Sequence, residues 1–425
     1  MNGRSKGQFL LCNFQQIRTI VKVRLKWVKN RSLDHIIDVQ TDLKAACLLK
    51  DAIARSSTGY LTSKSLENTQ KLLGITVPTL RFIRRFPTLF HEFPHPKWPS
   101  LACFELTHVA KLLRQQEMKV FDECQTDLVE RLCRLLMMSK SQMIPLQSIH
   151  PLKWDFGLPD DFDKNLVKRF PDHLQIVKGT SGLACLKLVQ WREEFAVSEL
   201  QKSNEKRGLE SDNGADGRSA YKYREFKRGK SALEFPMSFP RGYGAQKKVK
   251  AWMEEFQKLP YISPYEDSRR IDPNSELMEK RVVGVLHEFL SLTIYKKTKR
   301  NYLRSLREEL ILPHRFTRLF TRYPGIFYLS LKCKTTTVAL REGYRRGRLV
   351  ERHPVARHRD KFHHVMRTGL VYRCKGIEVL PLLDSLIDEA EEDKVEGQSD
   401  EEEIETSDEC YEAGTSEVES ASDED

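Results

Sequence analysis

Apolar, basic and aromatic positions form one short pattern that occurs three times along the chain. Each copy is a stretch of apolar and basic residues that ends in an aromatic residue followed by proline. The three endings are Phe86-Pro87, Phe170-Pro171 and Tyr323-Pro324. Because proline disfavours the helical conformation for the residue before it, a helix is predicted to end at each aromatic residue and the chain to become extended.

The residues around each copy repeat as well. A Val-Pro or Leu-Pro pair precedes each copy, and proline is tolerated in the first turn of a helix. Segments of alternating apolar residues follow each copy. They predict β-hairpins near residues 88–106, 173–189 and 326–341. We therefore predict an α+β fold that is predominantly helical, in which one winged-helix-like unit occurs three times. The predicted units are residues 39–110, 125–195 and 275–345.

Each basic stretch has two faces if it is helical. In the third copy, Phe316, Leu319 and Phe320 fall on one side at helical spacing. The arginines of the same copy fall on another side: Arg315, Arg318 and Arg322. A solvated surface is the ordinary reason for one such face. Three basic faces of the same kind favour a polyanionic partner.

Five further segments carry expectations of their own. Residues 21–29 alternate apolar and basic positions, like a half-buried strand, and Trp27 is a candidate for base stacking or for the core. A helix is predicted over 39–54. The polar, Gly-containing residues 201–220 are typical of a linker. Residues 276–310 predict two helices, the second very basic, and residues 342–348 predict a flexible cationic segment.

Charge is distributed unevenly along the chain. Residues 384–425 contain 20 Asp and Glu and one Lys, a net charge of −19. Since the whole chain carries +11, the remainder carries +30. This composition predicts a disordered acidic tail after residue 384 and a basic body whose first candidate partner is nucleic acid.

The first 33 residues contain no Asp or Glu but several Lys and Arg. An acid-poor, Arg-bearing N-terminus is typical of an organelle transit peptide, and a basic binding arm is the alternative. We expect a transit peptide over 1–20 and the main domain over 21–375.

Enzyme motifs are not found in the sequence. It has no phosphate-binding loop, dinucleotide-binding glycine pattern, nucleophile elbow or His-Glu-x-x-His zinc motif. A thiol hydrolase would need a Cys activated by a His. Cys103 and Cys185 fall on inward positions of predicted strands, where a thiol ordinarily packs. His363 and His364 are adjacent and have no ligand spacing. We predict no enzyme, no metal, no cofactor, no small-molecule substrate and no membrane span.

The motifs resemble those of the plant organelle RNA recognition domain. The resemblance rests on residues 23–31, on the phrase ending at Phe86-Pro87, on 235–243 and on 323–330, and it extends over about 20–375. It implies a nuclear-encoded plant protein that binds organellar intron RNA and promotes group II intron splicing as part of a ribonucleoprotein. Its mitochondrial splicing members are the most similar, with the chloroplast as the alternative location. The resemblance transfers no catalytic residue.

Charge placement alone supplies the candidate RNA-binding residues. They are Lys22, Arg24, Lys26, Trp27, Lys29, Arg31, Arg81, Arg84, Arg85, Lys168, Arg169, Lys247, Lys248, Lys296, Lys297, Lys299, Arg300, Arg304, Arg315, Arg318, Arg322, Arg345, Arg346 and Arg348. Lys and Arg would neutralise phosphates, and nearby aromatics would stack on unpaired bases. The expected partner is single-stranded or structured intron RNA, with other splicing factors as further candidates. A DNA-binding winged-helix module is the alternative, and the thiol hydrolase ranks below it.

Overall fold

The computed structural model describes residues 27–67, 69–179, 182–212, 232–239, 246–332 and 336–374. The expected transit peptide (1–20) and acidic tail (384–425) lie outside the described residues. So do three candidate RNA-binding residues: Lys22, Arg24 and Lys26.

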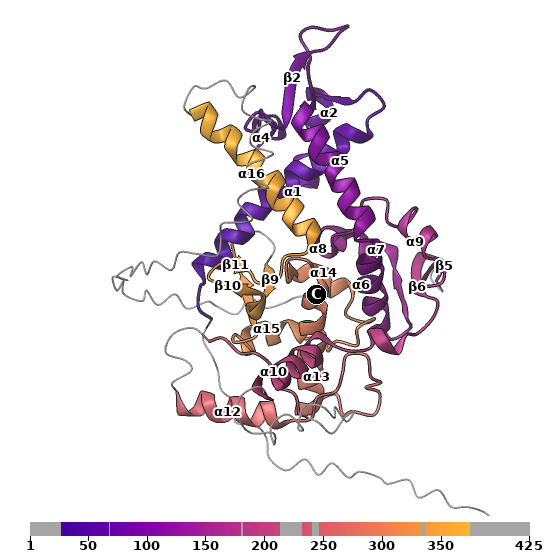
Figure 1. Ribbon diagram of the computed structural model, residues 1–425, viewed down its shortest axis with the longest axis vertical. Coiled ribbons are helices and arrows are strands. Elements are labelled where there is room, and N and C mark those ends of the chain that lie inside the picture. The colour runs from indigo at the N-terminus through magenta and orange to yellow at the C-terminus, as the bar shows by residue number, and fades with distance from the viewer. Residues whose placement is uncertain are drawn as a thin grey trace, which may run out of the picture. The chain divides into compact units, whose positions relative to one another are not determined.

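The first part of the chain begins with a long helix (Figure 1). Asn30 caps this helix, because its side chain accepts a hydrogen bond from the backbone N–H of Leu33 at 3.1 Å. Thr62 caps a later helix in the same way, with its side chain accepting from the backbone N–H of Ser65. The elements are α1 (Arg31–Arg55), β1 (Tyr60–Thr62), α2 (Ser63–Leu66), α3 (Gln70–Leu73), α4 (Thr79–Ile83), β2 (Phe90–Pro94), β3 (Ala102–Leu106) and α5 (His108–Glu123).

The second part repeats this order of strand, helices and hairpin. Its elements are α6 (Gln125–Met137), β4 (Met143–Pro145), α7 (Leu146–Ile149), the 3₁₀ turn η1 (His150–Leu152), α8 (Lys153–Phe156), α9 (Leu166–Arg169), β5 (Leu174–Lys178), β6 (Ala184–Leu188), η2 (Glu193–Phe195) and α10 (Glu199–Asp212).

The third part has the same order once more and ends in a long helix. Its elements are α12 (Lys247–Lys258), α13 (Glu276–Leu292), β7 (Lys297–Lys299), α14 (Arg300–Ser305), η3 (Phe316–Arg318), α15 (Leu319–Arg322), β8 (Phe327–Ser330), β9 (Thr337–Leu340), η4 (Arg341–Gly343), β10 (Tyr344–Arg345), β11 (Arg348–Leu349) and α16 (Pro354–Cys374).

Three antiparallel sheets in the described residues have the same strand order. They are β1-β3-β2, β4-β6-β5 and β7-β9-β8. The second and third strands of each form a hairpin, in registers that include Phe90 with Leu106, Leu174 with Leu188, and Phe327 with Leu340. The hairpins therefore lie where the sequence predicts them. The short helices α9 and α15 end directly before the predicted aromatic residue, whereas α4 ends three residues before Phe86, at Ile83.

Backbone conformation also recurs at matching places. Gly59, Gln142 and Lys296 each have a positive φ directly before the first strand of a sheet. Gly157 and Ile311 have a positive φ directly before a Leu-Pro pair, and Gly74 has one three residues before Val77-Pro78. A positive φ is unusual outside glycine, so its recurrence at Gln142, Lys296 and Ile311 reflects a shared geometry of the turns.

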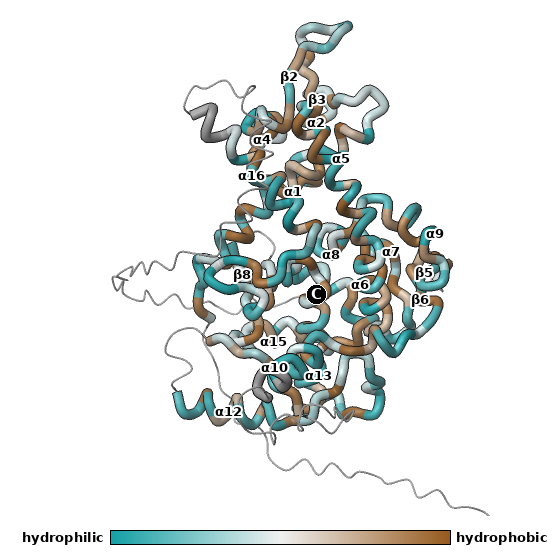
Figure 2. Tube along the Cα trace, in the orientation of Figure 1, coloured by the Kyte–Doolittle hydropathy of each residue, from teal (hydrophilic) through white to brown (hydrophobic). Residues whose placement is uncertain are grey.

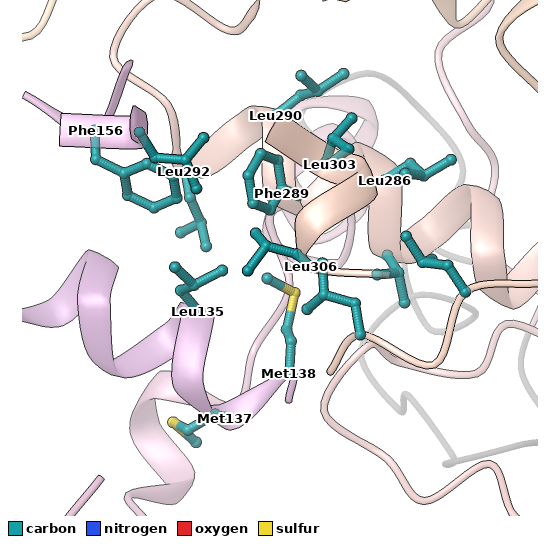
Figure 3. Packing of buried hydrophobic residues seen from close by; sticks show 14 of the residues in the cluster. Leu135, Met137, Met138, Phe156, Leu286, Phe289, Leu290, Leu292, Leu303 and Leu306 are labelled. Atoms are coloured by element: carbon teal, nitrogen blue, oxygen red, sulfur yellow. The ribbon is translucent and has the colours of Figure 1, made fainter. Parts of the chain in front are cut away.

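The largest hydrophobic core lies where α6 packs against α13. Leu135 and Met138 meet Phe289 and Leu306 there (Figure 3). Hydrophobic and hydrophilic positions alternate along the helices, as elements with one buried side require (Figure 2).

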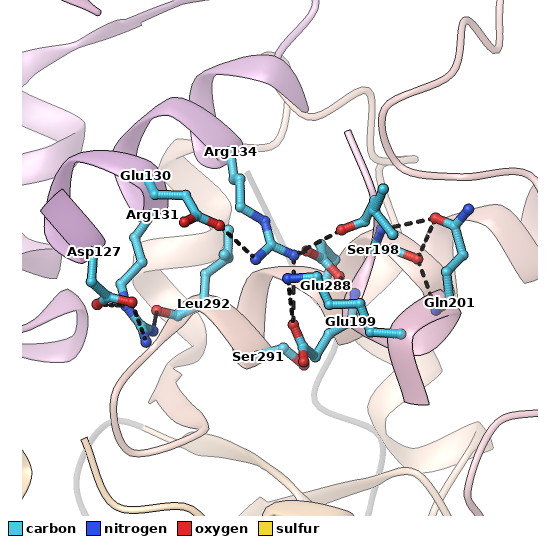
Figure 4. Close-up of polar contacts among 12 residues, drawn as sticks. Asp127, Glu130, Arg131, Arg134, Ser198, Glu199, Gln201, Glu288, Ser291 and Leu292 are labelled. Carbon is cyan, nitrogen blue, oxygen red and sulfur yellow. Dashed lines mark hydrogen bonds and ion pairs between the residues drawn. The ribbon is translucent and has the colours of Figure 1, made fainter. Parts of the chain in front are cut away.

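A buried ion pair crosses the same junction. Arg134 of α6 donates to Glu288 of α13 at 2.6 Å, and the Glu288 side chain is 0% exposed (Figure 4). Tyr265 also donates to Glu288, at 2.7 Å. Removing one member of such a pair leaves a buried charge without compensation, so this cluster holds the second and third parts in one arrangement.

Several expectations are wrong in detail. Residues 201–212 are helical in α10 rather than part of a linker, because Leu200, Gln201 and Asn204 are buried against the body of the protein. Residues 213–220 lie outside the described residues. The helix predicted over 39–54 begins eight residues earlier, at the Asn30 cap.

The expected basic helix in 276–310 is divided. Lys297–Lys299 forms strand β7, and only Arg300–Ser305 is helical, because edge-strand pairing with β9 satisfies the backbone there. Residues 342–348 belong to η4 and the β10–β11 hairpin instead of a flexible segment, and Arg346 and Gly347 form its tight turn at positive φ. Residues 27–30 are not a strand, and residues 21–26 lie outside the described residues.

Candidate nucleic-acid interface

Some of the basic residues in and just after α4, the short helix before the first hairpin, form ion pairs with acidic residues. Arg81 and Arg84 are exposed, and Arg84 donates to Glu92 of β2 through two nitrogens, at 2.8 and 2.6 Å. Arg85 is half-buried and lies 3.8 Å from Asp42. An exposed ion pair contributes little stability, so these guanidinium groups can exchange a carboxylate for a phosphate at small cost.

The other two short helices present cations in a similar way. Lys168 and Arg169 are exposed on α9, with Arg169 3.0 Å from Asp122. Arg315 and Arg318 are exposed beside α15, whereas Arg322 pairs with Glu279 at 2.9 Å. The apolar residues Phe316, Leu319 and Phe320 are buried, so the predicted division into two faces is confirmed for this copy.

Lys296 differs from the other cations because its charged end is enclosed. Its Nζ donates to the backbone oxygen of Ser291 at 2.7 Å, and burial lowers its pKa. Lys299, by contrast, lies over the ring of Tyr302 at 5.9 Å. The remaining basic candidates of this region are Lys297, Arg300 and Arg304, of which Arg304 is exposed. Lys296 therefore adds less to the outer surface than its neighbours do.

Two groups of candidates lie next to each other at the start of α1. A Cβ at Gly347 would lie 3.3 Å from Ser32 Cβ, so the β10–β11 turn packs beside Arg31. Lys29 and Arg31 are exposed there, as are the three arginines of the turn: Arg345, Arg346 and Arg348. The structure thus brings together cations some 315 residues apart in sequence, which no local pattern could reveal.

The candidates Lys247 and Lys248 lie elsewhere in the chain, at the start of α12, and both are exposed.

Trp27 has a packing role. Its Nε1 donates to the backbone oxygen of Leu329 at 2.8 Å, and its ring stacks on Tyr328 with centroids 6.3 Å apart. It is 37% exposed. Trp27 therefore covers the third hairpin and leaves only an edge for any other contact.

The three hairpins differ in what they expose. All four residues of β8 and of β9 are buried. In contrast, β2 and β5 each leave three of five residues exposed. The buried Asp34 of α1 explains the difference, because it accepts hydrogen bonds from Tyr328 at 2.9 Å and Ser330 at 2.6 Å and fixes α1 over the third hairpin.

The first hairpin carries an aromatic stack that the sequence reasoning missed. Trp98, 60% exposed, stacks on His95 with centroids 4.8 Å apart, and Tyr60 packs edge-on against both His95 and Phe93. His95 Nδ1 accepts the backbone N–H groups of residues 97 and 98, which holds the turn beneath Trp98. The dense run of aromatic residues and prolines over 91–99 is the signal that could have identified it.

Cysteine and histidine chemistry does not form a second site in the described residues. Cys103 and Cys185 are buried, as predicted, and burial raises the pKa of Cys103. Burial lowers the pKa of His363 to about 4, while His364 is exposed on α16. Within the described ranges, no group of His, Cys, Asp or Glu could hold a metal ion. No described helix is long and apolar enough to cross a membrane.

Comparison with known proteins identifies relatives over most of the chain. The family model for the plant organelle RNA recognition domain matches residues 28–371. The chain is 35% identical over 364 residues to "Protein WHAT'S THIS FACTOR 9, mitochondrial" of Arabidopsis thaliana, which covers 84% of this chain and 88% of that protein. It is 28% identical over 402 residues to "Protein WHAT'S THIS FACTOR 1, chloroplastic" of Zea mays, covering 91% and 77%. No solved structure shows a significant match.

These relatives agree with the organellar location expected from the sequence, since one is mitochondrial and the other chloroplastic. The family match begins one residue after Trp27 and ends within α16, so it includes all three sheets and both hairpins with exposed outer faces. The chain belongs to the plant organelle RNA recognition domain family.

Proposed function

We propose that this protein binds intron RNA in plant mitochondria and promotes the splicing of group II introns, without enzymatic activity of its own. The observation that carries the proposal is the family match over residues 28–371. The mitochondrial relative at 35% identity supports the choice of organelle, and chloroplast relatives keep the plastid as the alternative.

The mechanism is binding. Exposed cations of the short helices and of the β10–β11 turn neutralise phosphates and release counterions. Trp98 and its neighbours offer ring faces to unpaired bases, and such stacking accepts many sequences. A protein bound in this way holds an intron in its splicing-competent fold or prevents a competing one.

Three copies of one winged-helix-like unit are the architecture that we infer for this binding. The order of strand, helices and hairpin, the strand order within each sheet, and the recurring positive φ values support the inference. The units are close to residues 39–110, 125–195 and 275–345.

Single-stranded or structured RNA fits these units better than duplex DNA. A DNA-binding helix must reach into a major groove about 12 Å wide. The helices before the hairpins have five, four and four residues, and a four-residue helix is only about 6 Å long. Exposed hairpin faces suit unpaired nucleotides, which can spread over a surface.

Two measurements test the function. Loss of the protein should leave unspliced group II introns in mitochondrial transcripts, and crosslinking with sequencing should recover those same introns bound to it. Competition between intron RNA and duplex DNA of equal length should favour the RNA. Normal splicing of all mitochondrial introns in the absence of the protein would contradict the proposal.

A further inference from the structure

A cleft of about 620 Å³ lies among helices from all three parts of the chain. Its wall includes Lys44 of α1, Trp154 of α8, Tyr302 of α14 and Arg359 of α16. The volume is within the range of sites that hold small organic ligands. None of these four residues was among the candidates from the sequence.

Three of the five carboxylates that line the wall pair with cations, and Asp161 and Asp163 are the other two. Asp51 lies 3.1 Å from Lys50, and Glu117 also pairs with Lys50. Asp160 accepts from Lys153 at 2.7 Å. These three acids are therefore neutralised locally, and the wall cations that lie beside its aromatic rings are Lys44 and Arg359.

Arg359 is one such cation, and it is 3% exposed. Its guanidinium carbon lies 3.5 Å from the ring centroid of Trp154, and its Nη1 donates to the backbone oxygen of Trp154 at 2.8 Å. The ring of Tyr295 lies beside the same guanidinium, with its centroid 6.0 Å from the guanidinium carbon, so two aromatic rings hold Arg359 in place.

Lys44 is the second such cation. Its Nζ lies 5.9 Å from the Trp154 ring centroid and 6.0 Å from that of Tyr302. The described residues provide no carboxylate within 4.0 Å of it. Burial and the nearby cations Lys299, Arg359 and Lys153 lower its pKa, while Asp155 acts in the opposite direction. A phosphate between Lys44 and Lys299 would relieve this concentration of positive charge.

Two cations lie over the ring of Tyr302. Lys44 Nζ is 6.0 Å and Lys299 Nζ is 5.9 Å from the ring centroid. An aromatic ring beside cations matches a nucleotide, which has a flat base and a phosphate. We propose that this cleft binds one nucleotide of a single RNA strand, with the base against Tyr302 and Trp154 and the phosphate beside Lys44. The inference rests on the proposed function and identifies a specific place where the RNA enters the protein.

A second hollow favours a strand over a free nucleotide. It measures about 170 Å³ and shares Met118, Phe121 and Pro159 with the cleft wall. Arg169, a cation that the sequence already singled out, lies on its wall together with its ion-pair partner Asp122. A strand leaving the cleft can therefore continue past α9.

The test measures how the full chain binds a single-stranded RNA that contains 4-thiouridine. Irradiation should crosslink this RNA to the tryptic peptide of residues 154–164, which carries Trp154. Lys44→Gln and Tyr302→Leu should each lower the affinity about tenfold, the loss expected for one charge-assisted contact or one stacked base. Lys44→Arg should retain most of the affinity, because it keeps the charge.

Arg357→Gln is the matched control. Arg357 is exposed on α16 two residues before Arg359, so this variant removes one charge outside the cleft and should lower affinity less than threefold. Melting curves identify any variant that fails to fold, and the crosslink map of the unmodified chain does not depend on them.

The outcomes separate this inference from the proposed function. RNA binding without crosslinks at 154–164, and with Lys44→Gln and Tyr302→Leu both equal to the control, would overturn the cleft site alone. Displacement of the strand by adenosine monophosphate at equal concentration would overturn the assignment to an RNA strand. Failure of the unmodified chain to bind any intron RNA would overturn the proposed function itself.

Discussion

The first and third hairpins have the same topology but different surroundings. Tyr328 of β8 and His91 of β2 both stand four residues after the proline of their copy. Tyr328 is 1% exposed, beneath Trp27 and hydrogen-bonded to Asp34, whereas the His91 side chain is 61% exposed. The same element is thus part of the core in one place and free in another, and its topology alone does not reveal its role.

The second hairpin resembles the first. Gln175 occupies the position of His91 and is exposed, and Ile176 and Leu183 are both 41% exposed near it. We infer that the first two hairpins offer binding faces, while the third uses its face to hold α1. Substitutions in these two kinds of hairpin should therefore affect stability and RNA binding differently.

Tyr328→Ala should lower the free energy of unfolding by about 3–5 kcal/mol, because it removes a buried ring and one of the donors to the buried Asp34. His91→Ala at the matching position of the first hairpin should change it by less than ~0.5 kcal/mol. Urea denaturation of both variants provides the measurement. Equal losses would contradict the difference between the hairpins.

Trp98→Ala should weaken binding of single-stranded RNA by about 1–3 kcal/mol, the usual contribution of one stacked base, and leave the melting temperature unchanged. Leu331→Ala is the control, since Leu331 is an exposed apolar residue just after β8. It should change affinity less than twofold. Titration of both variants with one labelled intron fragment decides the matter, and equal affinities would remove Trp98 from the interface.

Lys178→Ala and Lys187→Ala on the second hairpin should weaken binding by less than about 1 kcal/mol each. If each lysine neutralises one phosphate, the slope of log affinity against log salt should become shallower by about 0.7 per variant. The check is a series of binding curves at increasing salt. Unchanged slopes in both variants would remove the second hairpin from the binding face.

The smallest expected effect concerns pH and two His–Glu pairs. His287 is buried and bonded to Glu342, whereas the His91–Glu105 pair is exposed. Burial opposes the charge on His287, but Glu342 outweighs it and raises the pKa of His287 above its ordinary value of 6.5. The stability from this pair is therefore complete below pH 6.5 and is lost as the pH rises through the folded-state pKa.

Unfolding measured from pH 6 to pH 9 should show that loss in the unmodified chain. Glu342→Gln should reduce this slope, while Glu105→Gln at the exposed pair should leave it as it is. A slope that survives Glu342→Gln unchanged would show that another group is responsible.

Much of the fold follows from local sequence. Proline after an aromatic residue ends α9 and α15, and alternating apolar residues specify the hairpins, because both effects act within a few residues. The packing of Trp27 over the third hairpin does not follow from local sequence. It depends on Trp27 meeting Leu329 and Tyr328, contacts across about 300 residues.

The candidate site was predicted less completely than the fold. Charge counting found the exposed cations of α9 and of the β10–β11 turn, but it also included Lys296, whose Nζ is held by a backbone oxygen. It could not find Lys44 or Arg359, because a cleft forms from helices distant in sequence. It passed over Trp98 because the indole carries no charge.

Hydroxyl-radical footprinting of the full chain, with and without intron RNA, distinguishes the hairpins that bind RNA from the hairpin that holds α1. It reports the solvent accessibility of side chains on all three hairpins in one experiment. RNA should protect Trp98 on the first hairpin and Ile176 and Leu183 on the second, while Leu331 beside the third remains as reactive as before. Protection of Leu331 with unchanged reactivity at Trp98 and Ile176 would contradict this difference between the hairpins.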